Sequence, residues 1–380
     1  MTSTSATSAP QVHPGPADEL RVAVREFLTG TSPTEVVRRE MDTDTGFDRS
    51  LWTRMAVELG LHGIAVPEEF DGAGAGLAEL AVVFEEMGAA LLCAPFFSTV
   101  ALAIPALLNC GEPKDIAELL PALLDGSATA TLILDGRLGP WDPAAVDLTA
   151  RHDGTGYRIS GVAPLVLDGH TADTVLVAAD TDAGISLFAV DAEADGLTRT
   201  ALAGLDRTRK IARLDFHAVP ARLIGRAGRA EPGLNLVADT ATVLLAAEQV
   251  GAAGRCLDTA VGYAKERIQF GRAIGSFQAV KHRCADMLVA VEGARSAVTH
   301  AAATTDAGER AIAASVAKLA ASEAFLHAAL DSMRVHGGIG FTWEHDAHLY
   351  VRRAKAGSLM FGDPDHHALR LADLVSPPHH

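Results

Sequence analysis

The sequence is short of cysteine, of aromatic residues and of basic charge. Its 380 residues include four cysteines, Cys93, Cys110, Cys256 and Cys284, and no two of them have the C-x-x-C spacing of a metal or redox site. Free, buried thiols are the expectation for such cysteines, and these persist in a reducing compartment. We therefore predict a cytoplasmic protein without a bound metal.

Basic residues are outnumbered, with 32 Lys and Arg against 48 Asp and Glu, so the net charge is −16. That balance argues against nucleic acid or an anionic membrane as the general partner. No run of eighteen apolar residues occurs, so no membrane span is expected. The first residues are polar and proline-rich and lack the regions of a signal peptide, which predicts a disordered lead-in over residues 1–16.

The sequence does contain a clear order of helices, sheet and helices. Over residues 17–127 apolar residues recur every three or four positions, as in "DELRVAVREFL", which predicts an N-terminal helical domain. Over 128–230 the period changes to two, as in "GISLFAVDA", which predicts a middle antiparallel β-domain. Over 231–376 long alanine-rich segments predict a C-terminal four-helix bundle. The predicted fold class is therefore α+β.

One segment, "YAKERIQFGRAIGSFQAVKHRCADM" (263–287), keeps helical periodicity on both sides of Gly271, which predicts a helix–turn–helix. In the simpler interpretation it is a helical hairpin packed into a core, with its basic residues on a solvated face. In the functional interpretation, Arg267 and Gln278 present a charge and an amide to a bound anion and a base. The residues alone leave both interpretations open.

Five segments, taken in order, resemble the acyl-CoA dehydrogenase family of flavoproteins. They are "GLHGIAVPEEFDGAGAG", "VVFEEMGAALLCAPF", "LDRTRKIARLDFHAVPARLIG", "ERIQFGRAIGSFQAVKHRCADM" and "RVHGGIGFTWEHDAHLYVRRAK". The resemblance covers about residues 20–375 and implies FAD as cofactor, an acyl-CoA substrate, an electron-acceptor flavoprotein and a homo- or hetero-oligomer, either dimer or tetramer. The implied reaction is α,β-dehydrogenation of the thioester, in which a carboxylate removes the α-proton and hydride passes to flavin N5.

The resemblance also explains the segment around Gly271. It implies that arginine and glutamine side chains of this segment reach across a subunit interface to the ADP half of a neighbour's FAD. Arginine suits a pyrophosphate because its planar fork donates hydrogen bonds in pairs, and the glycines of "RVHGG" allow the backbone to approach closely. The residues implied at this end of the cofactor are Arg267, Phe270, Phe277, Gln278, Arg334, Gly337 and Gly338.

The positions implied for the flavin ring have changed chemistry. In the family, a first strand carries a threonine that contacts the ring, and a second strand carries Trp-Ile-Thr. The matching positions here are Leu134 and the stretch from Leu165 to Leu167. Leucines cannot donate a hydrogen bond to the ring. Leu134 and Leu167 are therefore cofactor-site candidates that have lost the usual polar contact.

The usual position of the catalytic carboxylate holds no acid. Counting from the "RRAK" segment, that position is Phe361, and the alternative on the helix before the hairpin is Ala241. The candidates that remain are Asp363, two residues further on, and Glu248, on the same helix as Ala241. In the simpler interpretation, Asp363 is a turn residue before a proline and Glu248 is a helix-face charge.

Three functions follow from these observations. The first is an FAD-dependent acyl-CoA dehydrogenase with an unusual base. The second is a partner subunit of a heteromeric acyl-CoA dehydrogenase, with low activity alone, which donates contacts to the ADP half of the other chain's FAD. The third is a flavin monooxygenase on the same fold, which would need no α-proton base.

Overall fold

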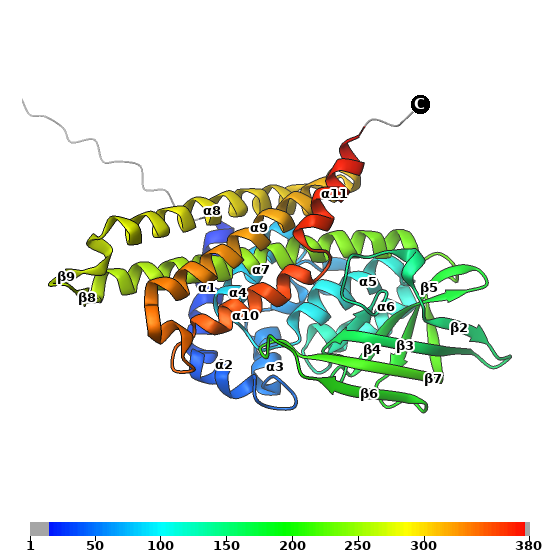
Figure 1. The fold of residues 1–380 in the computed structure, drawn as a ribbon. Coiled ribbons are helices and arrows are strands. Elements are labelled where there is room, and N and C mark those ends of the chain that lie inside the picture. Colours follow the sequence, from blue (N-terminus) through cyan, green and yellow to red (C-terminus); the bar gives the residue numbers. More distant parts are fainter. Residues whose placement is uncertain (1–14, 377–380) are drawn as a thin grey trace, which may run out of the picture.

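The computed structural model describes residues 15–376, so residues 1–14 of the predicted lead-in lie outside the described part. An N-terminal helical part, a sheet and a C-terminal helical part follow one another along the chain. Figure 1 shows the sheet at one end of the molecule and the long C-terminal helices extending to the other end. This is the helix–sheet–helix order that the periodicities predict.

The N-terminal part is built from short amphipathic helices. In α6, for example, Pro113 occupies the first turn and Asp115 accepts a hydrogen bond from the Glu112 amide at 3.0 Å, which fixes the helix start. The elements are α1 (Pro16–Thr31), α2 (Thr34–Glu40), α3 (Arg49–Val57), η1 (Leu61–Gly63), η2 (Glu68–Phe70), α4 (Leu77–Ala89), the π-helix η3 (Phe97–Ala103), α5 (Ile104–Cys110) and α6 (Pro113–Leu124).

The sheet closes on itself like a barrel, because β4 pairs with both β2 and β5, and β7 joins β3 to β5. Its strands are β1 (Ala130–Ile133), β2 (Thr149–His152), β3 (Tyr157–Leu167), β4 (Thr174–Thr181), β5 (Gly184–Asp191), β6 (Leu197–Leu202) and β7 (Ile211–Ile224). The prediction of a purely antiparallel sheet is wrong in one respect, since β4 pairs in parallel with β1 and β2. Alternation along a strand reports which face is buried but not the direction of its neighbour.

The C-terminal part contains the longest helices. Its elements are α7 (Glu231–Glu266), β8 (Ile268–Gln269), β9 (Arg272–Ala273), η5 (Ile274–Ser276), α8 (Gln278–Ala303), α9 (Ala307–His336), η6 (Gly337–Phe341), α10 (Ala347–Leu359) and α11 (Pro364–Val375). The predicted helix–turn–helix needs a correction, because a two-stranded hairpin, β8–β9, stands between α7 and α8. Gly271, with φ of 74°, allows its tight turn.

Helix α7 crosses α4 at very short distance. A Cβ atom added at Gly88 would lie 2.0 Å from the carbonyl oxygen of Glu248, and one added at Gly251 would lie 1.8 Å from that of Glu85. Only glycine permits this approach at both positions. The crossing brings α7 into the centre of the molecule, where most of its residues are buried.

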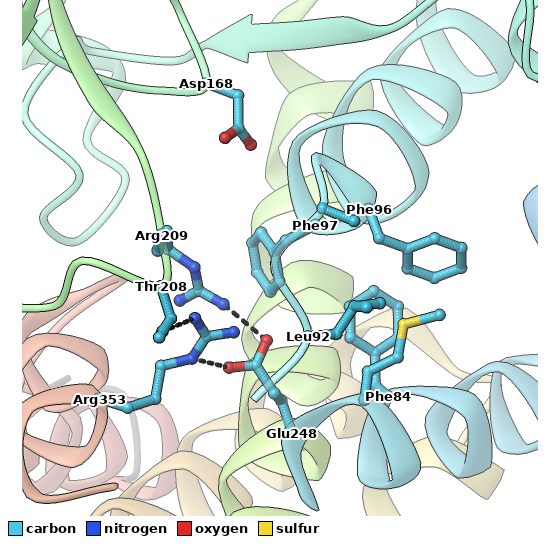
Figure 2. Close-up of a pocket in the computed structure, with 11 residues that line it drawn as sticks. Phe84, Leu92, Phe96, Phe97, Asp168, Thr208, Arg209, Glu248 and Arg353 are labelled. Atoms are coloured by element: carbon cyan, nitrogen blue, oxygen red, sulfur yellow. Dashed lines mark hydrogen bonds and ion pairs between the residues drawn. The ribbon is translucent and has the colours of Figure 1, made fainter. Parts of the chain in front are cut away.

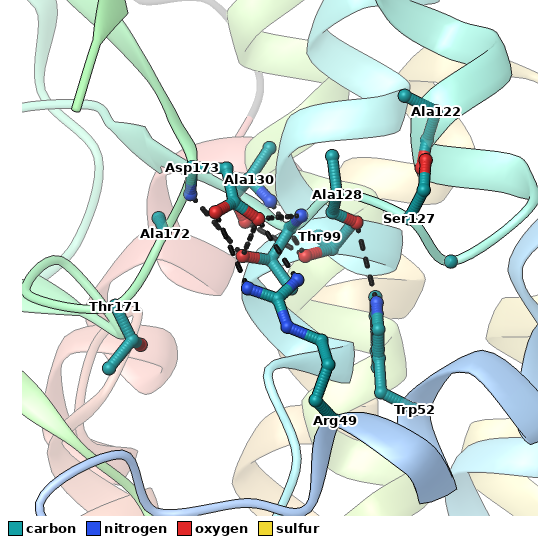
Figure 3. Close-up of polar contacts among 12 residues, drawn as sticks. Arg49, Trp52, Thr99, Ala122, Ser127, Ala128, Ala130, Thr171, Ala172 and Asp173 are labelled. Carbon is teal, nitrogen blue, oxygen red and sulfur yellow. Dashed lines mark hydrogen bonds and ion pairs between the residues drawn. The ribbon is translucent and has the colours of Figure 1, made fainter. Parts of the chain in front are cut away.

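Hydrogen bonds join the N-terminal helices to the sheet (Figure 3). Arg49 of α3 pairs with Asp173 at 3.0 Å, and Asp173 also accepts from the Thr129 amide at 2.8 Å. The Thr99 hydroxyl donates to the Ala130 carbonyl at 2.9 Å, and the Trp52 indole N–H donates to that of Ala128 at 3.3 Å. The Thr99 bond fixes η3 against β1, and the bonds of Arg49 and Trp52 hold α3 against the segments beside that strand.

Among residues 15–376, α7 is the one helix long and apolar enough to cross a membrane. The prediction of no span rested on uninterrupted apolar runs, whereas α7 meets the criterion on its average hydropathy. However, 83% of its most apolar window is buried inside the protein, which is typical of a core helix.

Candidate functional site

The predicted ring-site positions line a small cavity between the sheet and the C-terminal helices. Leu134, Leu138, Trp141, Leu165 and Phe361 are among the residues that line it, so we call it the Leu134–Phe361 cavity, and its volume is about 20 Å³. That volume holds roughly one water molecule. Leu134, Leu165 and Phe361, which come from different segments of the sequence, therefore meet at one cavity.

Leu167 does not line this cavity. It belongs to the hydrophobic core, with 1% of its surface exposed, and its carbonyl accepts a hydrogen bond from the Thr131 hydroxyl at 2.7 Å. Its neighbour Leu165 takes the cavity position instead. Residues two apart in a regular strand face the same side, so Leu165 and Leu167 would be expected to point the same way. However, β3 has an irregularity between Ala163 and Val166, which interrupts this alternation.

Phe361 fills the position at which the carboxylate was sought. Its ring is 4% exposed and lies 5.8 Å from the ring of Phe97, measured between centroids. Its backbone is in the left-handed region, with φ of 56°, and its amide donates to the Leu138 carbonyl at 3.0 Å. Its carbonyl in turn lies 3.0 Å from His367 Nε2. The residue is therefore held at both backbone ends.

A buried lysine fixes the loop that carries Phe361. Lys318 of α9 is fully buried and donates to the carbonyls of Ser358 at 3.2 Å and Gly362 at 3.0 Å, and to the Ser322 hydroxyl at 3.0 Å. Burial lowers the pKa of the Lys318 amine to about 7, with Asp363 as the nearest compensating charge. The ammonium group of a lysine has three N–H donors, and here each donor has an acceptor, so these bonds hold the loop in one position.

A second cavity beside it is lined by a buried ionic cluster (Figure 2). Glu248 of α7 accepts from Arg209 Nη2 at 2.6 Å and from Arg353 Nε at 2.9 Å. Arg353 also donates to the Thr208 hydroxyl at 2.8 Å and lies 3.4 Å from Asp206. All these side chains are buried, so the attraction between them is screened little by water.

Glu248 is consequently occupied by two arginines. Burial by itself would raise the pKa of its carboxyl, but the charges of Arg209 and Arg353 and their hydrogen bonds outweigh burial and lower the pKa. Two strong donors leave this carboxylate ill-suited to take a proton from carbon. Its role in the structure is to join α7, α10 and the segment before β7.

The sequence reasoning missed the arginines of this cluster and a nearby acid, Asp168. Asp168 follows β3 with φ of 49°, and its carboxylate accepts from the Ser98 hydroxyl at 2.6 Å. Burial raises the pKa of Asp168 to about 6. Arg209 and Arg353 lie in the segments "LDRTRK" and "VRRAK", which served only to recognise the family and to locate Phe361. The sequence signal that could have identified them is an arginine in a segment whose neighbours are expected to be buried.

Asp363 serves as a helix cap. Its side chain accepts a hydrogen bond from the His366 amide at 2.8 Å, at the N-terminus of α11, and the residue is exposed. This agrees with the simpler interpretation of the sequence, because aspartate before proline is a favoured helix start. The structure therefore brings neither acid candidate to the Leu134–Phe361 cavity as a free carboxylate.

The remaining candidates gather at the opposite end of the long helices. In Figure 1, β8 and β9 lie at the end of the molecule away from the sheet. Arg267, Gln278 and Arg334 are all exposed there, and Phe270 is 92% exposed with φ of 52°. Phe277 packs against it edge to face at 6.1 Å and carries the Arg272 guanidinium on its ring.

Gly337 and Gly338 follow α9 at the same end. Gly337 has φ of 64°, and a Cβ added at either glycine would meet no atom within 4 Å. The contact between the rings of Tyr263 and His336, at 4.6 Å, places the end of α7 beside the end of α9. Arg267 and the glycine loop are therefore parts of one surface.

The two ends fit FAD unequally. The hairpin end offers exposed arginines, an amide side chain and open glycine backbone, which suit a pyrophosphate and an adenosine. The Leu134–Phe361 cavity offers room for one water and no side-chain donor at Leu134 or Leu165, which does not suit a flavin ring. Figure 1 shows the hairpin β8–β9 and the sheet at opposite ends of the molecule, so the two groups of residues belong to different parts of the chain's surface.

Comparison with known proteins gives concordant matches. The model of the acyl-CoA dehydrogenase N-terminal domain matches residues 17–127, and that of the C-terminal domain matches residues 239–375. The chain is 36% identical to acyl-CoA dehydrogenase IpdE2 of Mycobacterium tuberculosis over 359 residues, covering 94% of this chain and 96% of that protein.

Solved structures are similar over almost the whole chain. A variant of the Tcur3481-Tcur3483 steroid ACAD is 34% identical with a TM-score of 0.82, covering 94% of this chain and 97% of that chain. The ChsE4-ChsE5 complex from Mycobacterium tuberculosis is 30% identical with a TM-score of 0.86, covering 96% and 99%. These matches confirm the predicted α+β fold.

Proposed function

The chain belongs to the acyl-CoA dehydrogenase family of FAD-dependent oxidoreductases, and we propose that it works as one subunit of a heteromeric acyl-CoA dehydrogenase. In this proposal a related chain supplies the catalytic carboxylate and the flavin-ring site. This chain supplies Arg267, Gln278 and the glycine loop to the ADP half of that chain's FAD.

The observation that carries the proposal is the position of Phe361. A buried aromatic ring stands where the family resemblance places the base, and the cavity beside it has room for one water. The neighbouring acid Glu248 is bound by two arginines and Asp363 caps a helix. A chain that ran the reaction by itself would need a free carboxylate at a cofactor.

The retained end of the molecule supports the other half of the proposal. A hairpin with an almost fully exposed phenylalanine and an exposed arginine is costly to keep unless something covers it. Two solved structures similar to this chain carry paired names, Tcur3481-Tcur3483 and ChsE4-ChsE5, the second called a complex. This supports a related but different chain as the partner.

The same likeness supports a substrate class. One of the two similar structures, Tcur3481-Tcur3483, is a steroid ACAD by name. We therefore choose acyl-CoA thioesters whose acyl group carries a steroid as the first substrates to test with the assembled enzyme.

The test is flavin content and activity with and without the partner. We expect the chain purified alone to hold little FAD. When it is co-expressed with a second acyl-CoA dehydrogenase family chain of the same organism that carries the catalytic carboxylate, we expect a yellow complex that a steroid acyl-CoA bleaches. Arg267→Ala in this chain should lower the flavin content of that complex while the two chains still co-purify.

The opposite result is equally clear. If the chain alone retains one FAD per protomer and exchanges the α-proton of a bound acyl-CoA, it is a complete dehydrogenase. Asp363→Asn and Glu248→Gln would then identify its base, since each removes an acid and keeps the side-chain shape.

A further inference from the structure

Two arginines at the hairpin end share one buried carboxylate. Asp331 of α9 accepts from Arg283 Nη1 of α8 at 2.8 Å and from Arg334 Nη1 at 2.6 Å, and His327 Nε2 lies 3.2 Å from its other oxygen. The Asp331 side chain is 7% exposed, whereas those of Arg283 and Arg334 are 45% and 56% exposed. The carboxylate is inside the helix pair and the guanidinium groups reach outward.

The arrangement leaves donors free on the outer side. Each guanidinium has five N–H donors and gives one nitrogen to Asp331, and within residues 15–376 neither Arg283 nor Arg334 donates to another residue. Burial would raise the pKa of Asp331, but the hydrogen bond from Arg334 and the charge of Arg283 lower it overall. Asp331 is therefore ionised, and the group of two arginines and one carboxylate keeps a net positive charge.

An arginine that is fixed by a protein partner loses less side-chain entropy on binding an anion than a mobile arginine does. A free arginine loses side-chain entropy when it clamps an anion, whereas an arginine fixed by a buried partner has lost part of that entropy on folding. Two planar guanidinium groups can also each donate paired hydrogen bonds, one group to each of two linked phosphates.

We propose that Asp331 is a positioning residue that holds Arg283 and Arg334 as a pair for the pyrophosphate of the partner chain's FAD. The inference rests on the proposed function, because it concerns the same FAD. It adds Arg283 to the binding surface, and it assigns to Asp331 an indirect role without contact to the cofactor.

When Asp331 is removed, a positioning role and a purely electrostatic role predict opposite changes in the affinity for FAD. Removing a carboxylate from the neighbourhood of an anion should strengthen anion binding if only charge counted. If Asp331 positions the arginines, its removal should weaken binding, because the freed side chains lose their alignment.

The experiment uses the complex of this chain with the carboxylate-bearing partner chain of the proposed function, stripped of flavin. Affinities for FAD and for FMN, which lacks the pyrophosphate link and the adenosine, are measured by flavin fluorescence. We expect Asp331→Asn and Arg283→Ala each to weaken FAD binding about tenfold and to leave FMN binding unchanged. Arg226→Ala, an exposed arginine paired with Glu112 in the N-terminal half, is the control and should change neither.

Other outcomes overturn the inference in distinct ways. Unchanged or tighter FAD binding in Asp331→Asn, with weaker binding in Arg267→Ala, removes the role of Asp331 and leaves the proposed function in place. Equal losses for FAD and FMN mean that Asp331 is only structural. No effect of Arg267→Ala means that the proposed function fails, and this inference fails with it. If Asp331→Asn does not fold, Asp331→Glu decides, because it keeps the charge and displaces the carboxylate by one methylene: weaker FAD binding supports the positioning role, and unchanged binding overturns it.

Discussion

Two phenylalanines with the same unusual backbone conformation have opposite surroundings. Phe361 has φ of 56° and is 4% exposed, and Phe270 has φ of 52° and is 92% exposed. Phe361→Ala should lower the free energy of unfolding of the isolated chain by about 3–5 kcal/mol, since it removes a buried ring. Phe270→Ala should change it by less than about 0.5 kcal/mol, because its ring meets water.

Urea denaturation of the two variants and the parent measures both values. Both phenylalanines have nearly the same positive φ, so backbone strain contributes equally to the two substitutions. The difference between their losses of unfolding free energy therefore reports the burial of the ring. Equal losses of unfolding free energy in the two variants would contradict the assignment of Phe361 as a buried ring that lines the Leu134–Phe361 cavity.

Glu248 is predicted to be a structural carboxylate. Glu248→Gln removes the anion that the buried Arg209 and Arg353 share, while Arg353 keeps Asp206 at 3.4 Å, and should cost roughly 3–5 kcal/mol of stability. The control Glu58→Gln breaks an exposed pair with Arg54 and should have little effect. Thermal unfolding of both variants tests this, and a parent-like Glu248→Gln would show that the cluster contributes no net stability.

Because of His367, the stability of the folded chain should decrease as the pH falls. Burial lowers the pKa of its imidazole to about 3, against about 6.5 for an unfolded histidine, so protons bind preferentially to the unfolded chain in that interval. Its stabilising contribution is complete above pH 6.5 and is lost as the pH falls towards 3. Burial lowers the pKa of His62 to about 4 in the same direction.

Asp168 opposes the two histidines. Burial raises its pKa to about 6, so its contribution to stability falls as the pH rises from about 3.8 to 6. We therefore expect His367→Gln to flatten the loss of melting temperature between pH 6.5 and 4. The same change at the exposed His300 should leave that slope as in the parent. A parallel slope in His367→Gln would contradict the role of burial at this residue.

At the scale of elements, the crossing of α4 and α7 determines the centre of the protein. Gly88→Ala places a methyl group 2.0 Å from the Glu248 carbonyl, so the helices must separate. We expect a loss of about 1–3 kcal/mol. Gly293→Ala on the exposed side of α8 meets no atom within 4 Å and should stabilise by about 0.5–1 kcal/mol.

Calorimetry of these two variants distinguishes packing from helix propensity. Both changes replace glycine by a better helix former, so propensity predicts the same sign for both. Opposite signs are expected from the structure. A stabilising Gly88→Ala would mean that the two helices separate at little cost.

At the scale of the whole molecule, the separation of the hairpin end from the Leu134–Phe361 cavity governs how FAD stabilises the protein. A ligand that binds only the folded pair stabilises that pair by an amount that grows with the logarithm of the ratio of free ligand to Kd, and so raises its melting temperature. We expect added FAD to raise the melting temperature of the complex with the related chain and not that of this chain alone. A dose-dependent rise for the isolated chain would contradict the division of the site between two chains.

Much of the architecture was accessible from the sequence. Helix and strand periods gave the order of the three parts, because burial of one face repeats every 3.6 or every two residues. The parallel pairing of β4 and the β8–β9 hairpin were not accessible, since strand direction and a two-residue ladder leave no period. The resemblance to the family carried FAD and the acyl-CoA chemistry, which periodicity does not contain.

The sequence by itself determined that Phe361 and Ala241 carry no acid and that Leu134 and Leu165 carry no donor, because a residue's chemistry is fixed wherever it lies. Only the tertiary structure decided what replaces that chemistry. Glu248 meets Arg209 and Arg353 across separations of 39 and 105 residues, and Asp331 meets Arg283 across 48. Such contacts arise from the packing of helices against each other and the sheet, and no local pattern in the chain records them.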